Sequence, residues 1–98
     1  MRSTIGVKEV ISVAHRPLGG GPLHGHSYEI VAWFDGGQDA VPLKAALKAV
    51  LAELDHADMP NDLSRAEDMG AWIGARLPGC KVVDVNRPLE GFYACVML

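Results

Sequence analysis

The chain has 98 residues, of which 49% are hydrophobic, enough for one small domain with its own core. Its formal net charge is -3, and its nine Lys and Arg residues are scattered along the sequence. This distribution argues against nucleic acid and against an anionic membrane surface as partners. No apolar run is long enough to span a membrane, and no leader pattern is recognised. Because Cys80 and Cys95 alone make no disulfide framework, we expect a reduced, cytoplasmic protein.

Two strands are predicted in the N-terminal third of the chain. Residues 4–15, TIGVKEVISVAH, alternate loosely and are rich in Val and Ile. Residues 24–36, HGHSYEIVAWFDG, form the second predicted strand. The residues between them, RPLGGGPL, include three glycines and two prolines and are predicted to form a loop. An antiparallel hairpin is the simplest connection between the two strands.

Two helices are predicted to follow the hairpin. Residues 41–56, VPLKAALKAVLAELDH, carry one apolar stripe at helical spacing, and Pro42 suits a first-turn position. Residues 64–79, SRAEDMGAWIGARLPG, open with Ser64 and Glu67 at the spacing of a capping box. The Pro-Gly pair at the end of this segment predicts the end of the helix.

The pattern of a strand returns twice near the C-terminus. Residues 80–85 and 91–98 are predicted strands, with a turn, NRPLEG, between them. The order ββααββ predicts a single α+β domain over residues 1–98, with two helices on one face of a four-stranded antiparallel sheet. Such a sheet ends in two open edges, and the last strand carries little charge to protect its edge. We therefore expect a neighbouring subunit to close that edge.

Histidines gather where the first two strands meet the loop. His24 and His26 share a face because strand side chains alternate, and Gly25 keeps the opposite face open. Antiparallel pairing would add His15, since cross-strand Cβ atoms lie roughly 4.5–5.5 Å apart. Three imidazoles with one open position are typical of a catalytic zinc site. The alternative is that the His-Gly-His pair is a chance pattern of surface residues.

Five short segments resemble those of the 6-pyruvoyltetrahydropterin synthase and 6-carboxytetrahydropterin synthase family. In chain order they are SVAH, LHGHSY, LDHADMPN, SRAEDMGAWI and VVDVNRPLEGFY. They follow the family's order and together cover most of the chain. All four histidines of the sequence fall on family positions.

The resemblance implies a fold, a metal and an activity. Family members adopt the tunnelling fold (T-fold), in which subunits join their sheets into a barrel and two rings stack, commonly as a homohexamer of two trimers. The resemblance implies a zinc ion (Zn2+) bound by His15, His24 and His26. It also implies a lyase that acts on a pterin, dihydroneopterin triphosphate, by eliminating triphosphate and rearranging the side chain. Bacterial members of the carboxy branch supply the biosynthesis of queuosine.

Asp55 and His56 match the catalytic relay dyad of the family. A carboxylate can orient an imidazole and stabilise its protonated form, so that the imidazole shuttles protons near neutral pH. Without the resemblance, Asp55 is interpreted as a solvated charge at a helix end. His56 is then a C-terminal helix residue that interacts favourably with the helix dipole.

The sequence departs from the family pattern at the expected nucleophile. The family's catalytic cysteine stands four residues before the His-Gly-His segment, and Gly20 occupies that position here. Cys80 or Cys95 would have to reach the site from elsewhere, and a free cysteine in a strand is usually a buried packing residue. The connection after the second strand is also shorter than usual. The chain therefore resembles a short, divergent member of the family.

A second departure concerns recognition of the pterin. The family uses a glutamate after the third strand, because the pterin edge offers two parallel N–H donors that want two acceptors. Asn86 and Arg87 match that glutamate and the threonine that usually follows it, and asparagine has only one acceptor oxygen. Glu90 could fold back to supply the carboxylate. The alternative for Glu90 is an exposed charge in a turn.

Two functions follow from these observations. The first is a zinc-dependent pterin lyase that works through the metal and the dyad. The second is a non-catalytic, zinc-containing T-fold protein that binds a pterin or a partner. Retention of the three histidines and the dyad favours the enzyme, whereas loss of the cysteine and of the pterin glutamate favours the second function.

Overall fold

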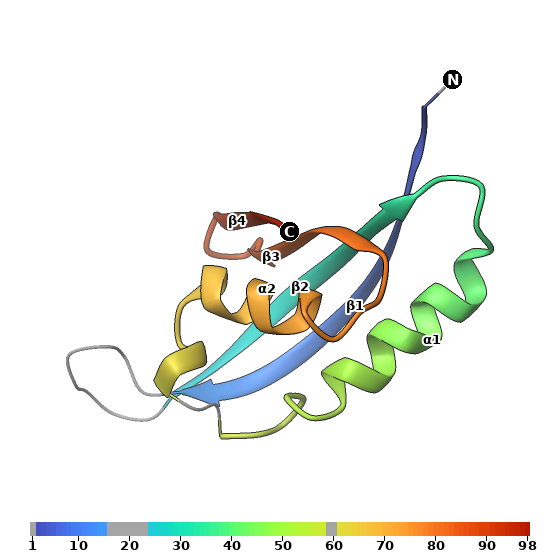
Figure 1. The fold of residues 1–98 in the computed structure, drawn as a ribbon. Coiled ribbons are helices and arrows are strands. Elements are labelled where there is room, and N and C mark those ends of the chain that lie inside the picture. The colour runs from blue at the N-terminus through green and yellow to red at the C-terminus, as the bar shows by residue number, and fades with distance from the viewer. Residues whose placement is uncertain (1, 16–23, 59–60) are drawn as a thin grey trace.

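A computed structural model describes residues 2–15, 24–58 and 61–98 of the chain. The described part forms a four-stranded antiparallel sheet in the order β1-β2-β3-β4, with two α-helices (Figure 1). The elements in chain order are β1 (Thr4–His15), β2 (His24–Asp35), α1 (Ala40–Leu51), the short 3-10 helix η1 (Asn61–Leu63), α2 (Ala66–Gly74), β3 (Cys80–Arg87) and β4 (Phe92–Met97). The predicted α+β class and the ββααββ order are confirmed.

The strand register makes the β1–β2 hairpin the longest part of the sheet. β1 pairs with β2 along its whole length, from Thr4 opposite Asp35 to His15 opposite His24. β3 pairs with β2 only as far as Glu29, which lies opposite Asn86. The end of the hairpin that carries the histidines therefore runs past β3 and β4 (Figure 1).

Both helices pack on the same face of the sheet, which we call the covered face. α1 lies along β1, while α2 lies over β3 and β4 (Figure 1). The largest fully buried side chains come from both layers: Ile30, Phe34, Val83 and Val85 from the strands, and Leu47, Leu51, Met69 and Ile73 from the helices. Burial of one such aliphatic side chain contributes about 1.5–3 kcal/mol, so this layer interface stabilises the fold.

The opposite face of the sheet, which we call the uncovered face, carries exposed apolar side chains. By the register, Val10, Tyr93 and Met97 belong to this face, and they are 59%, 69% and 81% exposed. Trp33 lies on the same face, where its indole Nε1 donates a hydrogen bond of 2.8 Å to Oδ2 of Asp84. No helix packs over this face in the described part of the chain.

The structure corrects the predicted end of the first helix. α1 ends at Leu51, with Ala52 as its C-cap, rather than continuing to His56. The chain then turns back along the outer edge of β1, where the His56 N–H donates to the Ser12 carbonyl at 2.6 Å. These hydrogen bonds to the strand replace the helical ones, so the interpretation of His56 as a helix residue is wrong.

The structure also corrects the start of the second helix. α2 begins at Ala66, and its N-cap is Arg65, which makes no side-chain capping hydrogen bond. The prediction of Ser64 as the N-cap residue is therefore wrong, because Ser64 lies one residue before the cap position. The first turn of α2 carries two acidic residues, Glu67 and Asp68.

Two expectations drawn from composition can be compared with the structure. Both cysteines are free thiols, and they differ in environment: Cys80 is buried at the start of β3, whereas Cys95 is exposed in β4. The described residues include no helix that is both long and apolar enough to cross a membrane.

Candidate functional site

The pairing of β1 with β2 brings the positions of the three candidate metal ligands together. His15 lies directly opposite His24, and His26 follows opposite Val13, so the three histidine positions share the covered face of the sheet. The imidazoles of His15 and His24 lie outside what the structure describes. Among the side chains that it does describe, no group of three or more could hold a metal ion. The strand pairing assumed for a three-histidine site is confirmed, and the metal itself stays a prediction.

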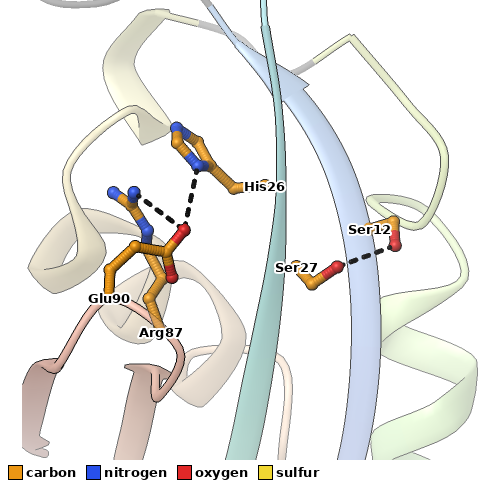
Figure 2. A network of polar contacts seen from close by, with 5 residues as sticks. All are labelled: Ser12, His26, Ser27, Arg87 and Glu90. Carbon is orange, nitrogen blue, oxygen red and sulfur yellow. Dashed lines mark hydrogen bonds and ion pairs between the residues drawn. The ribbon is translucent and has the colours of Figure 1, made fainter.

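The described imidazole of His26 lies beside two charged side chains from the β3–β4 turn. Its Nδ1 is 4.0 Å from Oε1 of Glu90, and the same oxygen is 3.4 Å from Nη2 of Arg87. Figure 2 shows these three residues together on one side of β2. Glu90 was expected either to fold back toward the site or to be an exposed charge in a turn, and in the structure it lies beside a candidate metal ligand.

Tyr28 forms the inner wall of this cluster. Its ring lies 6.1 Å from that of His26, in an edge-on arrangement at 74°, and its side chain is buried. Burial raises the pKa of Tyr28, although the nearby Arg87 guanidinium acts in the opposite direction. Tyr28 therefore stays a neutral phenol beside His26 at physiological pH.

Arg87 is a functional candidate that the sequence pattern marks only as a departure from the family. Its guanidinium lies over the ring of Phe92, 5.3 Å from the ring centre, and its Nε is buried without a hydrogen-bond partner among the described residues. The signal was present in the sequence, because Arg87 and Glu90 stand three residues apart around a turn. A turn brings such opposite charges together.

Asn86 lies apart from this cluster. It pairs with Glu29 of β2 and Tyr93 of β4, which places it on the uncovered face. Arg87, its neighbour in the strand, belongs to the covered face by alternation. Within one chain, the two residues named as candidate pterin contacts, Asn86 and Glu90, therefore do not present their side chains to the same side of the sheet.

Asp55 and His56 do form a side-chain pair. His56 Nδ1 lies 3.1 Å from Oδ1 of Asp55, and the same oxygen accepts a hydrogen bond of 3.0 Å from the backbone N–H of Ser12. The Ser12 N–H, followed by the His56 imidazole, lowers the pKa of Asp55. The carboxylate is therefore ionised at neutral pH and can orient the imidazole, as a relay dyad requires.

The backbone at His56 is unusual. Its φ is 60°, in the left-handed region that residues other than glycine seldom adopt. Such a conformation costs on the order of 1–3 kcal/mol and persists where the surroundings impose it. Here the imposing contacts are the hydrogen bonds to β1 from His56 and its neighbour Ala57, whose carbonyl accepts from the Ala14 N–H at 3.0 Å. The fold thus presents the His56 side chain, 81% exposed, at the edge of the sheet.

A hollow of about 370 Å3 opens beside His56, at the end of the hairpin. Its lining residues are Ser12, Val13, Ala14, Gly25, His26, Ser27 and His56. The hydroxyls of Ser12 and Ser27 lie 3.4 Å apart, on the side of β2 opposite to His26 (Figure 2). A Cβ added at Gly25 would meet only the Val13 carbonyl among the described residues, at 3.6 Å. Gly25 therefore keeps this face open, as the sequence predicted.

A larger hollow, of about 570 Å3, lies at the other end of the hairpin. Its lining residues are Arg2, Ser3, Thr4, Asp35 and Gly36, so it has no imidazole and no hydrogen-bonded acid–base pair. The smaller hollow is the better candidate site, because it alone of the two borders both His26 and His56.

The nucleophile expected by resemblance has no counterpart in the described site. Gly20 lies outside the described residues. Neither Cys80 nor Cys95 lines the hollow beside His56. Burial raises the pKa of Cys80, and a hydrogen bond to the Asp84 carboxylate raises that of Cys95, so both thiols stay protonated at neutral pH. A rescue of the missing thiol by either cysteine within one chain receives no support.

Comparisons with known proteins bear on the fold. No family model matches the sequence, and no curated protein matches it at a significant level. The structure is similar to that of the Caenorhabditis elegans 6-pyruvoyl tetrahydropterin synthase, with a TM-score of 0.82 and 16% sequence identity. The match covers 100% of this chain and 96% of that chain. The protein therefore has, over its whole length, the fold of a 6-pyruvoyl tetrahydropterin synthase.

Proposed function

We propose that the protein is a zinc-dependent lyase that processes a pterin, either dihydroneopterin triphosphate or a related compound. The observation that carries the proposal is the fold match to a 6-pyruvoyl tetrahydropterin synthase over the whole chain. The strand register supports it, because the positions of His15, His24 and His26 come together on the covered face at the end of the hairpin. The hollow beside His56 opens at the same end, mainly on the other face, and His26 is one of its lining residues.

The donor set fits a zinc ion. His15 and His24 are paired across two antiparallel strands, a relation in which Cα atoms lie about 4.5–5.5 Å apart, and His26 follows two residues later. Three imidazoles without a thiolate are the ligands of a catalytic rather than a structural zinc site. When bound, zinc would polarise oxygens of the substrate and stabilise the negative charge that develops as a proton leaves carbon.

In this proposal the chain's own residues move the proton. The Asp55 carboxylate accepts a hydrogen bond from the Nδ1–H of His56. Nε2 is then the nitrogen that takes or gives a proton. The backbone N–H of Ser12 keeps Asp55 ionised and in place. A general acid–base group of this kind contributes about 10²–10⁴-fold to a reaction rate.

We further propose that the active form is a cytoplasmic homohexamer of two stacked trimers and that its product enters queuosine biosynthesis. The uncovered sheet face, with its exposed apolar side chains, supports the assembly. The pathway rests on the resemblance alone.

The second candidate is a non-catalytic, zinc-containing T-fold protein that binds a pterin or a partner. Two observations favour it. The described thiols do not line the hollow beside His56. Glu90, which would have to anchor the pterin in place of the missing glutamate, already lies beside Arg87 and His26.

An assay of the purified, zinc-loaded protein with dihydroneopterin triphosphate and with dihydroneopterin tests both candidates. If the protein is a lyase, we expect a pterin product from both substrates and release of triphosphate from the first. The reaction rate should fall by about 10²-fold or more in His56→Ala. That variant should keep its zinc. Tight binding of the pterin without product would favour the non-catalytic candidate. Neither binding nor product would contradict both.

A further inference from the structure

We propose that Glu90 is a positioning residue for His26, and that Arg87 in turn holds the Glu90 carboxylate. In this arrangement Glu90 accepts the Nδ1–H of His26 and thereby leaves Nε2 as the nitrogen that ligates the metal. The inference rests on the proposed zinc site. It assigns Glu90 a role different from that of a pterin anchor.

Two nitrogen-bearing side chains, those of His26 and Arg87, approach one carboxylate oxygen of Glu90. Oε1 of Glu90, in the turn after β3, lies 4.0 Å from Nδ1 of His26 in β2 and 3.4 Å from Nη2 of Arg87 at the end of β3. Figure 2 shows the carboxylate between the two nitrogen-bearing groups. The Glu90 carboxylate is thus the link between the imidazole and the guanidinium.

The orientation of the His26 imidazole indicates which ring nitrogen would bind the metal. A histidine that binds a metal through one ring nitrogen carries a proton on the other, and that N–H almost always donates to a carboxylate, a carbonyl or water. The nitrogen that faces Glu90 is Nδ1. The distance of 4.0 Å exceeds a hydrogen bond, but the Glu90 side chain is 42% exposed in a turn, so it can close the gap by rotation.

Arg87 is suited to hold the carboxylate in place. Its side chain is only 22% exposed, and it is packed against the ring of Phe92. A guanidinium fixed in this way restricts the Glu90 carboxylate to one region, close to His26. The ion pair with Arg87 is a charge-assisted contact that further restrains the position of the carboxylate.

The same geometry argues against Glu90 as the pterin anchor. An anchor must offer both carboxylate oxygens to two parallel N–H donors of the ligand. Oε1 of Glu90 is directed at Arg87 and His26 instead. Removal of the carboxylate should lower zinc affinity if Glu90 positions His26, and pterin affinity if Glu90 anchors the pterin.

The experiment measures zinc affinity by competition with a chelator, and the absorption spectrum of the Co2+-substituted protein, for the wild type and for Glu90→Gln. If Glu90 positions His26, zinc affinity should fall about 10–100-fold in Glu90→Gln, and the absorption spectrum of the Co2+-substituted protein should change. Glu53→Gln, the same change at an exposed glutamate after α1, should leave both unchanged. Arg87→Gln should give a smaller loss in the same direction. The double variant should lose less than the sum of the two, because the residues act through one contact.

Each other outcome overturns the inference in a recognisable way. Equal zinc affinity and identical Co2+ spectra in the wild type and Glu90→Gln would show that the carboxylate does not position His26. Loss of pterin affinity without a change in the metal site would assign Glu90 to the pterin. A wild type that binds no zinc would overturn the proposed metal site itself, and this inference with it. Circular dichroism of each variant confirms that the comparison is between folded proteins.

Discussion

The backbone of Ser12 binds the side chain of Asp55 across 43 residues of sequence. Its N–H donates 3.0 Å to Oδ1 of Asp55, and its carbonyl accepts from the N–H of the next residue, His56, at 2.6 Å. One residue of β1 therefore sets the position of both members of the candidate dyad. The relationship couples the acid–base pair to the hairpin that carries the candidate metal ligands.

This hydrogen bond predicts a pH dependence of stability. Because the folded state lowers the pKa of Asp55, the carboxylate contributes stability above its unfolded pKa of about 3.9. That stability is lost as the pH falls through the lower folded value. Asp55→Asn keeps an acceptor oxygen for Ser12 but cannot titrate. Denaturant unfolding at pH values from 7 down to 2 should show that the free energy of unfolding falls less steeply with pH in Asp55→Asn than in the wild type.

The control for this prediction is Asp62→Asn, the same change at an exposed aspartate in η1. It should not reproduce the shallower acid loss. Identical acid profiles for the wild type and Asp55→Asn would contradict the role of Ser12 as the stabilising donor.

The metal prediction concerns stoichiometry. The purified protein should contain about one zinc per chain, and His24→Ala or His26→Ala should lose it, because a three-histidine site has no spare ligand. His56→Ala is the matched control and should retain the metal. Elemental analysis that finds the wild type and His24→Ala equally empty would exclude the site.

The hollow beside His56 can be filled from Gly25. Gly25→Ala should fold at least as stably as the wild type, because among the described residues its Cβ meets only the Val13 carbonyl, at 3.6 Å, and alanine suits a strand better than glycine. Gly25→Leu would extend into the hollow between Ser12 and Ser27. If the pterin extends into this hollow, Gly25→Leu should lower pterin affinity by about tenfold or more, an effect of about 1.4 kcal/mol.

Calorimetric titration with a pterin, beside thermal unfolding of each variant, checks this expectation. Equal pterin affinity in Gly25→Leu and the wild type, with both proteins folded, would move the pterin site elsewhere.

The assembly prediction follows from the edge strands β1 and β4. The edge of β1 is already paired with residues 56–58 near Ser12 and Ala14, and the edge of β4 has no partner among the described residues. Light scattering at micromolar concentration should report an oligomer, most simply the hexamer that the resemblance implies. Met97→Lys, at an exposed position on the uncovered face, should weaken the assembly, since burial of an unpaired charge between subunits is costly. Val41→Lys, at an equally exposed position of α1, should not. A monomeric wild type would exclude the barrel.

The missing thiol can be restored at Gly20, which lies outside the described residues. If Gly20 occupies the place of the family's cysteine, the wild type should turn over dihydroneopterin triphosphate slowly or not at all. Gly20→Cys should then raise formation of the pyruvoyl or carboxy product, and adding Asn86→Glu tests whether the pterin is held too loosely. Product analysis at equal zinc loading measures both effects.

Gly19→Cys is the matched control for the loop. A gain in Gly19→Cys but not in Gly20→Cys would show that the alignment is shifted by one residue. Full family activity in the wild type would contradict the assignment of the nucleophile position.

Local patterns in the sequence determined the strands and their pairing. The alternation of Val and Ile, bounded by a loop of glycine and proline, predicted the first strand over the same residues, 4–15, that it occupies in the structure. The hairpin register then followed, because a loop of fixed length between two strands that pack one face permits few pairings. The juxtaposition of His15 and His24 was therefore predictable from the sequence.

Only the tertiary structure decided where α1 ends and which charges meet His26. Helical spacing continues through Leu54, so local propensity favours a helix that includes Asp55. Hydrogen bonds with Ser12, one donated by its N–H and one accepted by its carbonyl, hold that segment against β1 instead. Glu90 reaches His26 because the β3–β4 turn lies beside the projecting end of β2. The end of α1 and the position of Glu90 both depend on contacts between residues more than 40 positions apart. Local sequence patterns do not predict the free energies of such contacts.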